Sequence, residues 1–72
     1  MPYIIIRLDK ILKERNISQQ EFARMTDIRQ PSINDMCRNK TVRLPLDNLA
    51  KICDVLNLDI TDILELKKES KE

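Results

Sequence analysis

The sequence lacks two residue types on which many catalytic sites depend. None of the 72 residues is His or Gly. Without His, neither a Ser/His/Asp nor a Cys/His nucleophile system can be assembled, and the commonest zinc ligand is missing. Without Gly, the loops that hold phosphates in nucleotide-binding folds are absent. We therefore expect no enzymatic activity, no metal and no other cofactor.

Cysteine and long apolar runs are also scarce. Cys37 and Cys53 are too far apart for a metal-binding pair of the CxxC kind, and both lie at apolar helical positions, so we expect reduced thiols in the core. No apolar run has the length of a membrane span, and the opening MPYIIIR is too short and not basic enough for a signal peptide. We expect a cytoplasmic protein without a membrane partner.

The composition indicates one small globule. Seventy-two residues, 42% apolar and 35% charged, are too few for two ordinary domains. A core of this size stabilises the fold by only a few kcal/mol unless helices pack efficiently or a second copy adds an interface. The length also leaves no room for a separate ligand domain, so no small-molecule ligand is expected.

The charges are unevenly distributed although the net charge is only +1. Residues 1–43 contain nine Lys or Arg and five Asp or Glu, whereas residues 44–72 contain four and seven. Between Arg29 and Arg43, four basic residues accompany the single acid Asp35. These side chains form either a positive surface for an anionic partner or an ordinary solvated face, and composition alone favours neither.

Apolar spacing predicts an all-α fold of short helices. Ser18 and Glu21 form a capping-box pattern, Pro31 and Pro45 suit the openings of helices, and Asn16 and Asn57 are plausible helix stops. The expected helices begin at about Leu8, Gln19, Gln30, Leu46 and Ile60, and the third runs to about Cys37. Residues 1–66 form the predicted domain, and the tail 67–72, which has no apolar residue, is predicted to be disordered.

The β-branched segment Tyr3–Ile6 is the exception to helical spacing. One interpretation is a short extended segment that closes the core against Leu64 and Leu66, as a two-stranded pairing. The other is a dimer interface. The sequence does not choose between them.

Two of the predicted helices form a distinctive pair. Gln19–Met25 and about Gln30–Cys37 are separated by only a few residues, and the small residue Ala23 lies midway along the first. In a helix-turn-helix the two axes cross closely, so a small side chain is needed there. The exposed face of the second helix would carry hydrogen-bonding side chains suited to base edges and phosphates, namely Gln30, Ser32, Asn34, Asp35 and Arg38.

These segments, ISQQEFARMTDIRQPSINDM and LDNLAKICDVLNLDITDIL, resemble the Cro and phage-repressor type (XRE-like) helix-turn-helix regulators over about Leu8–Leu64. The resemblance implies a five-helix, lambda-repressor-like domain that binds operator DNA as a dimer, with its third helix in the major groove. It also implies site residues. Gln30, Pro31, Ser32 and Asp35 match base-reading positions; Gln19, Arg29, Arg38, Lys40, Thr41 and Arg43 match backbone-contacting positions.

The sequence departs from the family pattern at several positions. Asp27 and Asn39 stand where Gly is usual, and both residue types tolerate a positive φ. Leu12 and Cys37 replace an internal ion pair of many members, which predicts an apolar contact. Pro31 offers a base only an apolar contact.

Two functions remain open. The first is a sequence-specific transcriptional regulator, most simply a repressor, that binds double-stranded operator DNA as a homodimer. The second is a protein-binding module on the same fold, such as an antitoxin-like or phage accessory factor. The salt dependence of duplex binding distinguishes them.

Overall fold

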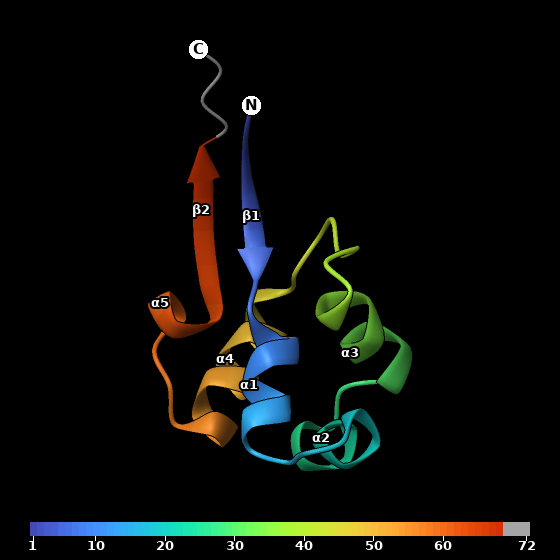
Figure 1. Ribbon diagram of the computed structural model, residues 1–72. Helices are drawn as coiled ribbons and strands as arrows, with labels where there is room; N and C mark the ends of the chain where they lie inside the picture. The colour runs from blue at the N-terminus through green and yellow to red at the C-terminus, as the bar shows by residue number, and fades with distance from the viewer. Residues whose placement is uncertain (69–72) are drawn as a thin grey trace.

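A computed structural model describes residues 1–68 of the chain, as five helices below a projecting pair of strands (Figure 1). The elements are β1 (Pro2–Ile6), α1 (Leu8–Glu14), α2 (Gln19–Thr26), α3 (Gln30–Cys37), α4 (Leu46–Leu56), α5 (Ile60–Ile63) and β2 (Leu64–Lys68). All five predicted helices are present. No helix within this part of the chain has the length and apolarity needed to cross a membrane.

The two strands correct the all-α expectation. β1 and β2 form an antiparallel sheet in which Ile4 faces Leu66 and Ile6 faces Leu64, so the two-stranded pairing considered from the sequence is confirmed. Lys67 and Lys68, expected in the disordered tail, instead pair with Tyr3 and Pro2. These polar residues were expected to be disordered, but they extend the strand because main-chain hydrogen bonds to β1 do not require apolar side chains. The rest of that predicted tail, 69–72, lies outside the described residues.

Asn and Asp residues make the turns that Gly would otherwise supply. Asn16, Asp27, Asn39 and Asn57 have φ between 57° and 60°. These short polar side chains tolerate the left-handed conformation better than other non-Gly residues do. The predicted helix stops at Asn16 and Asn57, and the positive φ at Asp27 and Asn39, are therefore confirmed.

The core lies where the helices meet beneath the sheet. Its buried apolar residues are Ile6, Leu8, Leu12, Phe22, Ile28, Ile33, Met36, Cys37, Leu49, Ile52, Leu56 and Ile63. Leu12 and Cys37 both belong to it, in agreement with an apolar replacement of the ion pair.

Three large apolar residues of the helices are exposed rather than buried. Leu46 and Ile60 are each the first residue of a helix, where the chain enters from the surface, and Met25 is placed on the outer face of α2. In the last turn of α2 the buried residue is Thr26, whose hydroxyl donates to the Phe22 carbonyl at 2.8 Å. Helical spacing predicts a row of buried apolar residues along a helix, but it does not show at which residue this row ends near the helix terminus.

Candidate nucleic-acid interface

The turn between α2 and α3 is held by side-chain bonds to the backbone. Ser18 Oγ accepts a hydrogen bond from the Glu21 N–H at 3.0 Å and so caps the start of α2. At the other end of α2, Thr26 Oγ1 also accepts from the Ile28 N–H at 3.3 Å, inside the core. Asp27 turns the chain with a left-handed backbone, and Arg29 is the N-cap of α3. The two helices therefore form a compact unit joined by residues 27–29.

The crossing of α2 and α3 places one face of α3 in the core and the other in solvent. Ile33 and Met36 are fully buried, and Ala23 of α2 is packed against the core. Gln30, Pro31 and Asp35 are exposed on the opposite face, and Ser32 is half-buried at its edge. Pro31 occupies the first turn of α3, where its missing N–H removes no helical bond.

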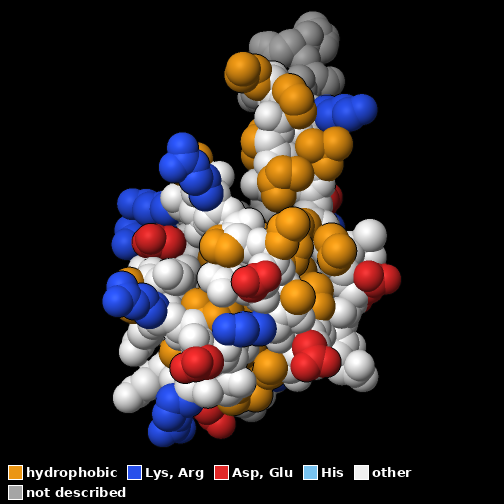
Figure 2. Space-filling model, turned by 180° about the vertical axis from the view of Figure 1, so that it is seen from behind, with side chains coloured by type: hydrophobic (Ala, Val, Ile, Leu, Met, Phe, Trp, Pro, Cys, Tyr) orange, Lys and Arg blue, Asp and Glu red, His pale blue; other side chains and the backbone are white. Residues whose placement is uncertain are grey.

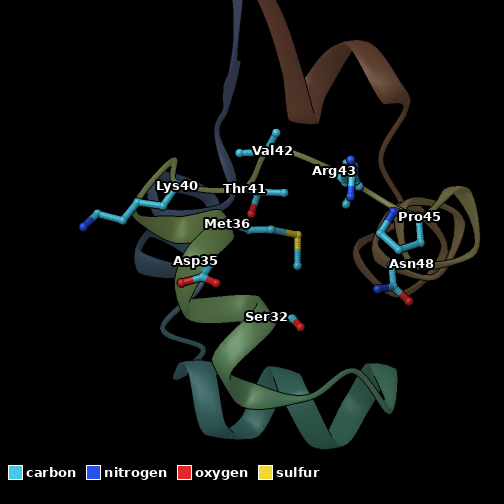
Figure 3. Close-up of a pocket in the computed structure, with 10 residues that line it drawn as sticks. Ser32, Asp35, Met36, Lys40, Thr41, Val42, Arg43, Pro45 and Asn48 are labelled. Carbon is cyan, nitrogen blue, oxygen red and sulfur yellow. The ribbon is translucent and has the colours of Figure 1, made fainter.

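A hollow of about 290 Å³ lies between α3, the loop that follows it and the start of α4 (Figure 3). Ser32 and Asp35 border it from α3, and Asn48 borders it from α4. The loop contributes three of the predicted phosphate-contacting residues, Lys40, Thr41 and Arg43. The structure therefore brings predicted base-reading and phosphate-contacting residues to one concave surface. The Lys40 side chain extends outward from it (Figure 3).

A second, shallower hollow continues this surface along α3. Gln30, Pro31, Asn34 and Asp35 line it, so Asp35 borders both hollows. All four predicted base-reading residues thus lie along the exposed side of α3. In the view of Figure 2 the Lys and Arg side chains gather mainly on the side of the molecule that carries α2 and α3.

The remaining predicted residues flank this surface without lining the main hollow. Arg29 and Arg38 are exposed at the two ends of α3, as its N-cap and C-cap. Gln19 is half-buried at the first position of α2, and its Oε1 accepts a hydrogen bond from Asn34 Nδ2 at 3.1 Å. That bond orients the Gln19 amide and leaves its NH₂ group as a donor for a phosphate.

Asn39 connects the surface to the sheet. Its Oδ1 accepts from the Ile6 N–H at 2.7 Å, and its Nδ2 donates to the Ile6 carbonyl at 3.1 Å. The amide thus occupies the place that a third strand's peptide group would take beside β1. Since Asn39 lies between the α3 C-cap Arg38 and Lys40, this pair of bonds holds the base of the loop in place.

Three residues of this site have contacts that the sequence analysis did not assign. It named Asn34 only among the exposed hydrogen-bonding side chains, took Asn39 only as a substitute for Gly, and gave Asn48 no role. The signal for Asn48 was its position four residues after Leu44, on the first turn of the helix that follows the basic loop. The Asn39 contact had no local signal, because its partner Ile6 is 33 residues away.

The chemistry of this site is that of hydrogen-bonding groups and cations. Within residues 1–68 there is no cluster of three or more His, Cys, Asp or Glu that could hold a metal. Burial, with Asp9 nearby, raises the pKa of the Cys37 thiol to about 11, so the thiol is protonated at neutral pH. Exposed amides, hydroxyls and cations on a helix and a loop are instead suited to hydrogen bonding and charge pairing.

A short helix pair whose turn is anchored by the buried Ile28, with an exposed polar face on its second helix and a basic loop beside it, defines a helix-turn-helix protein. A family model of the Cro/C1-type HTH DNA-binding domain matches residues 7–69. The chain belongs to this family, and the resemblance noted from the sequence is confirmed. A search of curated proteins found no match.

Proposed function

We propose that this protein is a sequence-specific regulator of transcription that binds operator DNA as a homodimer and acts as a repressor. The observation that carries the proposal is the concave surface that joins Ser32 and Asp35 of α3 to Lys40, Thr41 and Arg43 of the loop. A helix with exposed polar side chains fits the major groove, and a basic loop beside it can follow the phosphate backbone. Membership of a DNA-binding family supports the same function.

The residues have distinct roles in the proposal. Gln30 pairs bidentately with adenine, and Asp35 accepts from a cytosine amino group. Ser32 donates to a base edge, and Pro31 contacts a thymine methyl. The charged loop residues Lys40 and Arg43 pair with phosphates and set the affinity and its salt dependence rather than the sequence preference. Asp35 also repels phosphates, so it favours sequences in which its carboxylate finds a donor.

The α2 and α3 termini supply further phosphate contacts in the proposal. Gln19 presents its NH₂ group and the start of α2 to a phosphate. Arg29 and Arg38 approach the two strands from opposite ends of α3. Thr41 donates its hydroxyl from the loop. Asn48, which borders the hollow from the first turn of α4, adds a donor that sequence reasoning had not assigned.

Two copies would place their α3 helices in successive major grooves, about 34 Å apart, so the operator should be close to palindromic. Binding of this kind needs no enzymatic activity, cofactor or small-molecule ligand. It takes place in the cytoplasm, where the DNA of the cell or of an infecting phage is accessible. Occupying the operator then blocks polymerase.

Selection from a randomised duplex pool tests the proposal. The parent should enrich a palindromic consensus, and Gln30→Ala with Asp35→Ala should relax that consensus at the positions these residues read. Lys10→Ala with Lys13→Ala, two exposed α1 residues that line neither hollow of the proposed surface, is the matched control and should enrich the parent's consensus. Failure to enrich any sequence at low salt would contradict the proposal and favour a protein partner for the same fold.

A further inference from the structure

The hydrogen-bond phase of the β1–β2 sheet shows which main-chain groups point away from it. In an antiparallel pair, residues alternate between those bonded to the opposite strand and those whose N–H and C=O point outward. Ile6 gives both groups to Asn39, so they point away from β2. Arg7, one residue on, donates its N–H to the Ile63 carbonyl at 2.7 Å, in the expected alternate phase. Ile4 on β1 and Leu66 on β2 therefore also point their main-chain groups outward.

The outer edge of β1 is protected against a further strand. At one end Pro2 has no N–H to donate, and at the other end the Asn39 amide already satisfies Ile6. Only Ile4 between them keeps outward groups. Proline and covered backbone are common means of preventing edge-to-edge association.

The outer edge of β2 has neither protection. Among residues 1–68, no hydrogen bond to the outward groups of Leu66 is found, and no proline interrupts Leu64–Lys68. The Leu64 N–H is bonded to the Ile60 carbonyl, but the Leu64 carbonyl points outward in the same phase as Leu66. Leu66 is also 54% exposed, beside Ile4 at 53% on the same face of the sheet. The projecting strands are mainly hydrophobic in Figure 2.

We propose that the β2 edge is the homodimer interface and that it pairs, antiparallel, with β2 of a second copy across a two-fold axis at Leu66. The axis position follows from the phase, because Leu66 then exchanges both main-chain groups with Leu66 of the partner subunit. The Leu64 carbonyl accepts from the N–H of Lys68 of the partner subunit. The result is a continuous four-stranded sheet with apolar side chains from both copies on one face.

The charges on β2 are complementary in this register. With the axis at Leu66, Glu65 lies directly opposite Lys67 of the partner subunit, and Lys67 lies opposite Glu65 of the partner subunit. Oppositely charged residues that face each other across strands stabilise a pair, and like charges destabilise it. An axis at Glu65 or at Lys67 would oppose like charges and point the wrong main-chain groups inward. An axis at Leu64 would bring Asp62, a residue of α5, opposite a strand.

This proposal specifies the interface of the homodimer in the proposed function. It rests on the proposed function only for the role of the dimer on DNA. Two five-residue strands bury a small area, at the low end of protein interfaces, so the free dimer should be weak and a palindromic operator should favour it. Leu66 then lies directly opposite Leu66 of the partner subunit, and the contact between the two side chains buries part of their exposed surface. The sequence analysis had considered Tyr3–Ile6 as the dimer interface, whereas the phase of the sheet assigns that role to β2.

Proline substitution at the two edges distinguishes the interfaces. Leu66→Pro removes the outward N–H of β2 without removing a bond to β1, and Ile4→Pro does the same for β1. In sedimentation equilibrium, Leu66→Pro should weaken dimerisation at least about tenfold. Ile4→Pro, the matched control, should dimerise as the parent does. A monomeric parent at high micromolar concentration, or a dimer weakened by Ile4→Pro alone, would overturn the proposal.

Amide hydrogen exchange of the unmodified protein gives a second readout that does not depend on how the variants fold. The Leu66 amide should exchange quickly in dilute protein and slowly in concentrated protein, while the Glu65 and Lys67 amides, bonded to β1, should be protected at both concentrations. Unchanged exchange of Leu66 on dimerisation would refute the β2 pairing. Failure of the DNA proposal would look different, because β2 would still pair while no duplex bound.

Discussion

Asn39 offers a sharp test of how the sheet and the recognition surface are joined. Its side-chain amide makes two hydrogen bonds to the backbone of Ile6, and its own backbone has a φ of 57°. Alanine removes the two bonds and places a Cβ-bearing residue without a local hydrogen bond in the left-handed region. Glycine removes the same bonds but adopts that backbone freely. The two substitutions therefore separate the contribution of the side chain from that of the turn.

The expected magnitudes follow from these contacts. Each hydrogen bond contributes about 0.5–1.5 kcal/mol net, and the left-handed conformation costs Ala about 1 kcal/mol or more. Asn39→Ala should thus lower the free energy of unfolding by about 2–4 kcal/mol, and Asn39→Gly by about 1–3 kcal/mol. A domain of this length has a total stability of roughly 4–11 kcal/mol, so both changes should be large in relative terms.

Urea denaturation measures both free energies, provided that the slope with denaturant concentration stays constant. In the same variants, the Ile6 amide should exchange faster than neighbouring β1 amides because its acceptor is gone. Asn39→Gly with the parent's stability would show that the two bonds contribute nothing. Equal effects of Ala and Gly would refute the argument about the backbone conformation.

Three further predictions concern the turn, the core thiol and the loop. Thr26→Val should cost about 1–3 kcal/mol in urea denaturation because it leaves the buried Ile28 N–H without its acceptor, whereas Thr26→Ser should cost less. Because burial raises the folded-state pKa of Cys37 to about 11, the unfolded chain loses its thiol proton first. Stability should therefore fall between about pH 9 and about pH 11, by up to about 1.4 kcal/mol per pH unit, and Cys37→Ala should remove this component. A parent and a Cys37→Ala variant with parallel pH profiles would contradict that assignment. Lys40→Ala and Arg43→Ala should each reduce the slope of log affinity against log salt by about one in fluorescence anisotropy, and an unchanged slope would remove these residues from the phosphate contacts.

Much of the helical architecture was predictable because its signals are local. Ser18 at the start of α2, and Asn16 and Asn57 at helix ends, act within one turn of the chain, and each occupies the expected place. The spacing of buried residues indicated which face of α3 is exposed. From that face, the sequence placed Gln30 and Asp35 correctly on the outer surface.

Contacts between distant segments were less accessible to sequence reasoning. The extent of β2 to Lys68 depends on pairing with Pro2, at the other end of the chain, and nothing in a run of polar residues indicates that partner. Asn39 is similar, since its role depends on Ile6. The place of Asn48 at the hollow depends on how α4 packs beside the loop. Sequence patterns therefore located the recognition helix but not the residues that hold or complete its surroundings.

Amide chemical-shift mapping of the labelled protein, with a duplex carrying the selected consensus, is the decisive test of DNA binding through α3. We expect the largest shifts at Gln30, Ser32 and Asp35 of α3 and at Lys40–Arg43 of the loop, with small shifts at Lys10 and Glu14 of α1. Addition of salt should reverse the shifts of the loop first. Shifts concentrated on α1, or no shifts at a several-fold excess of duplex, would contradict DNA binding through α3.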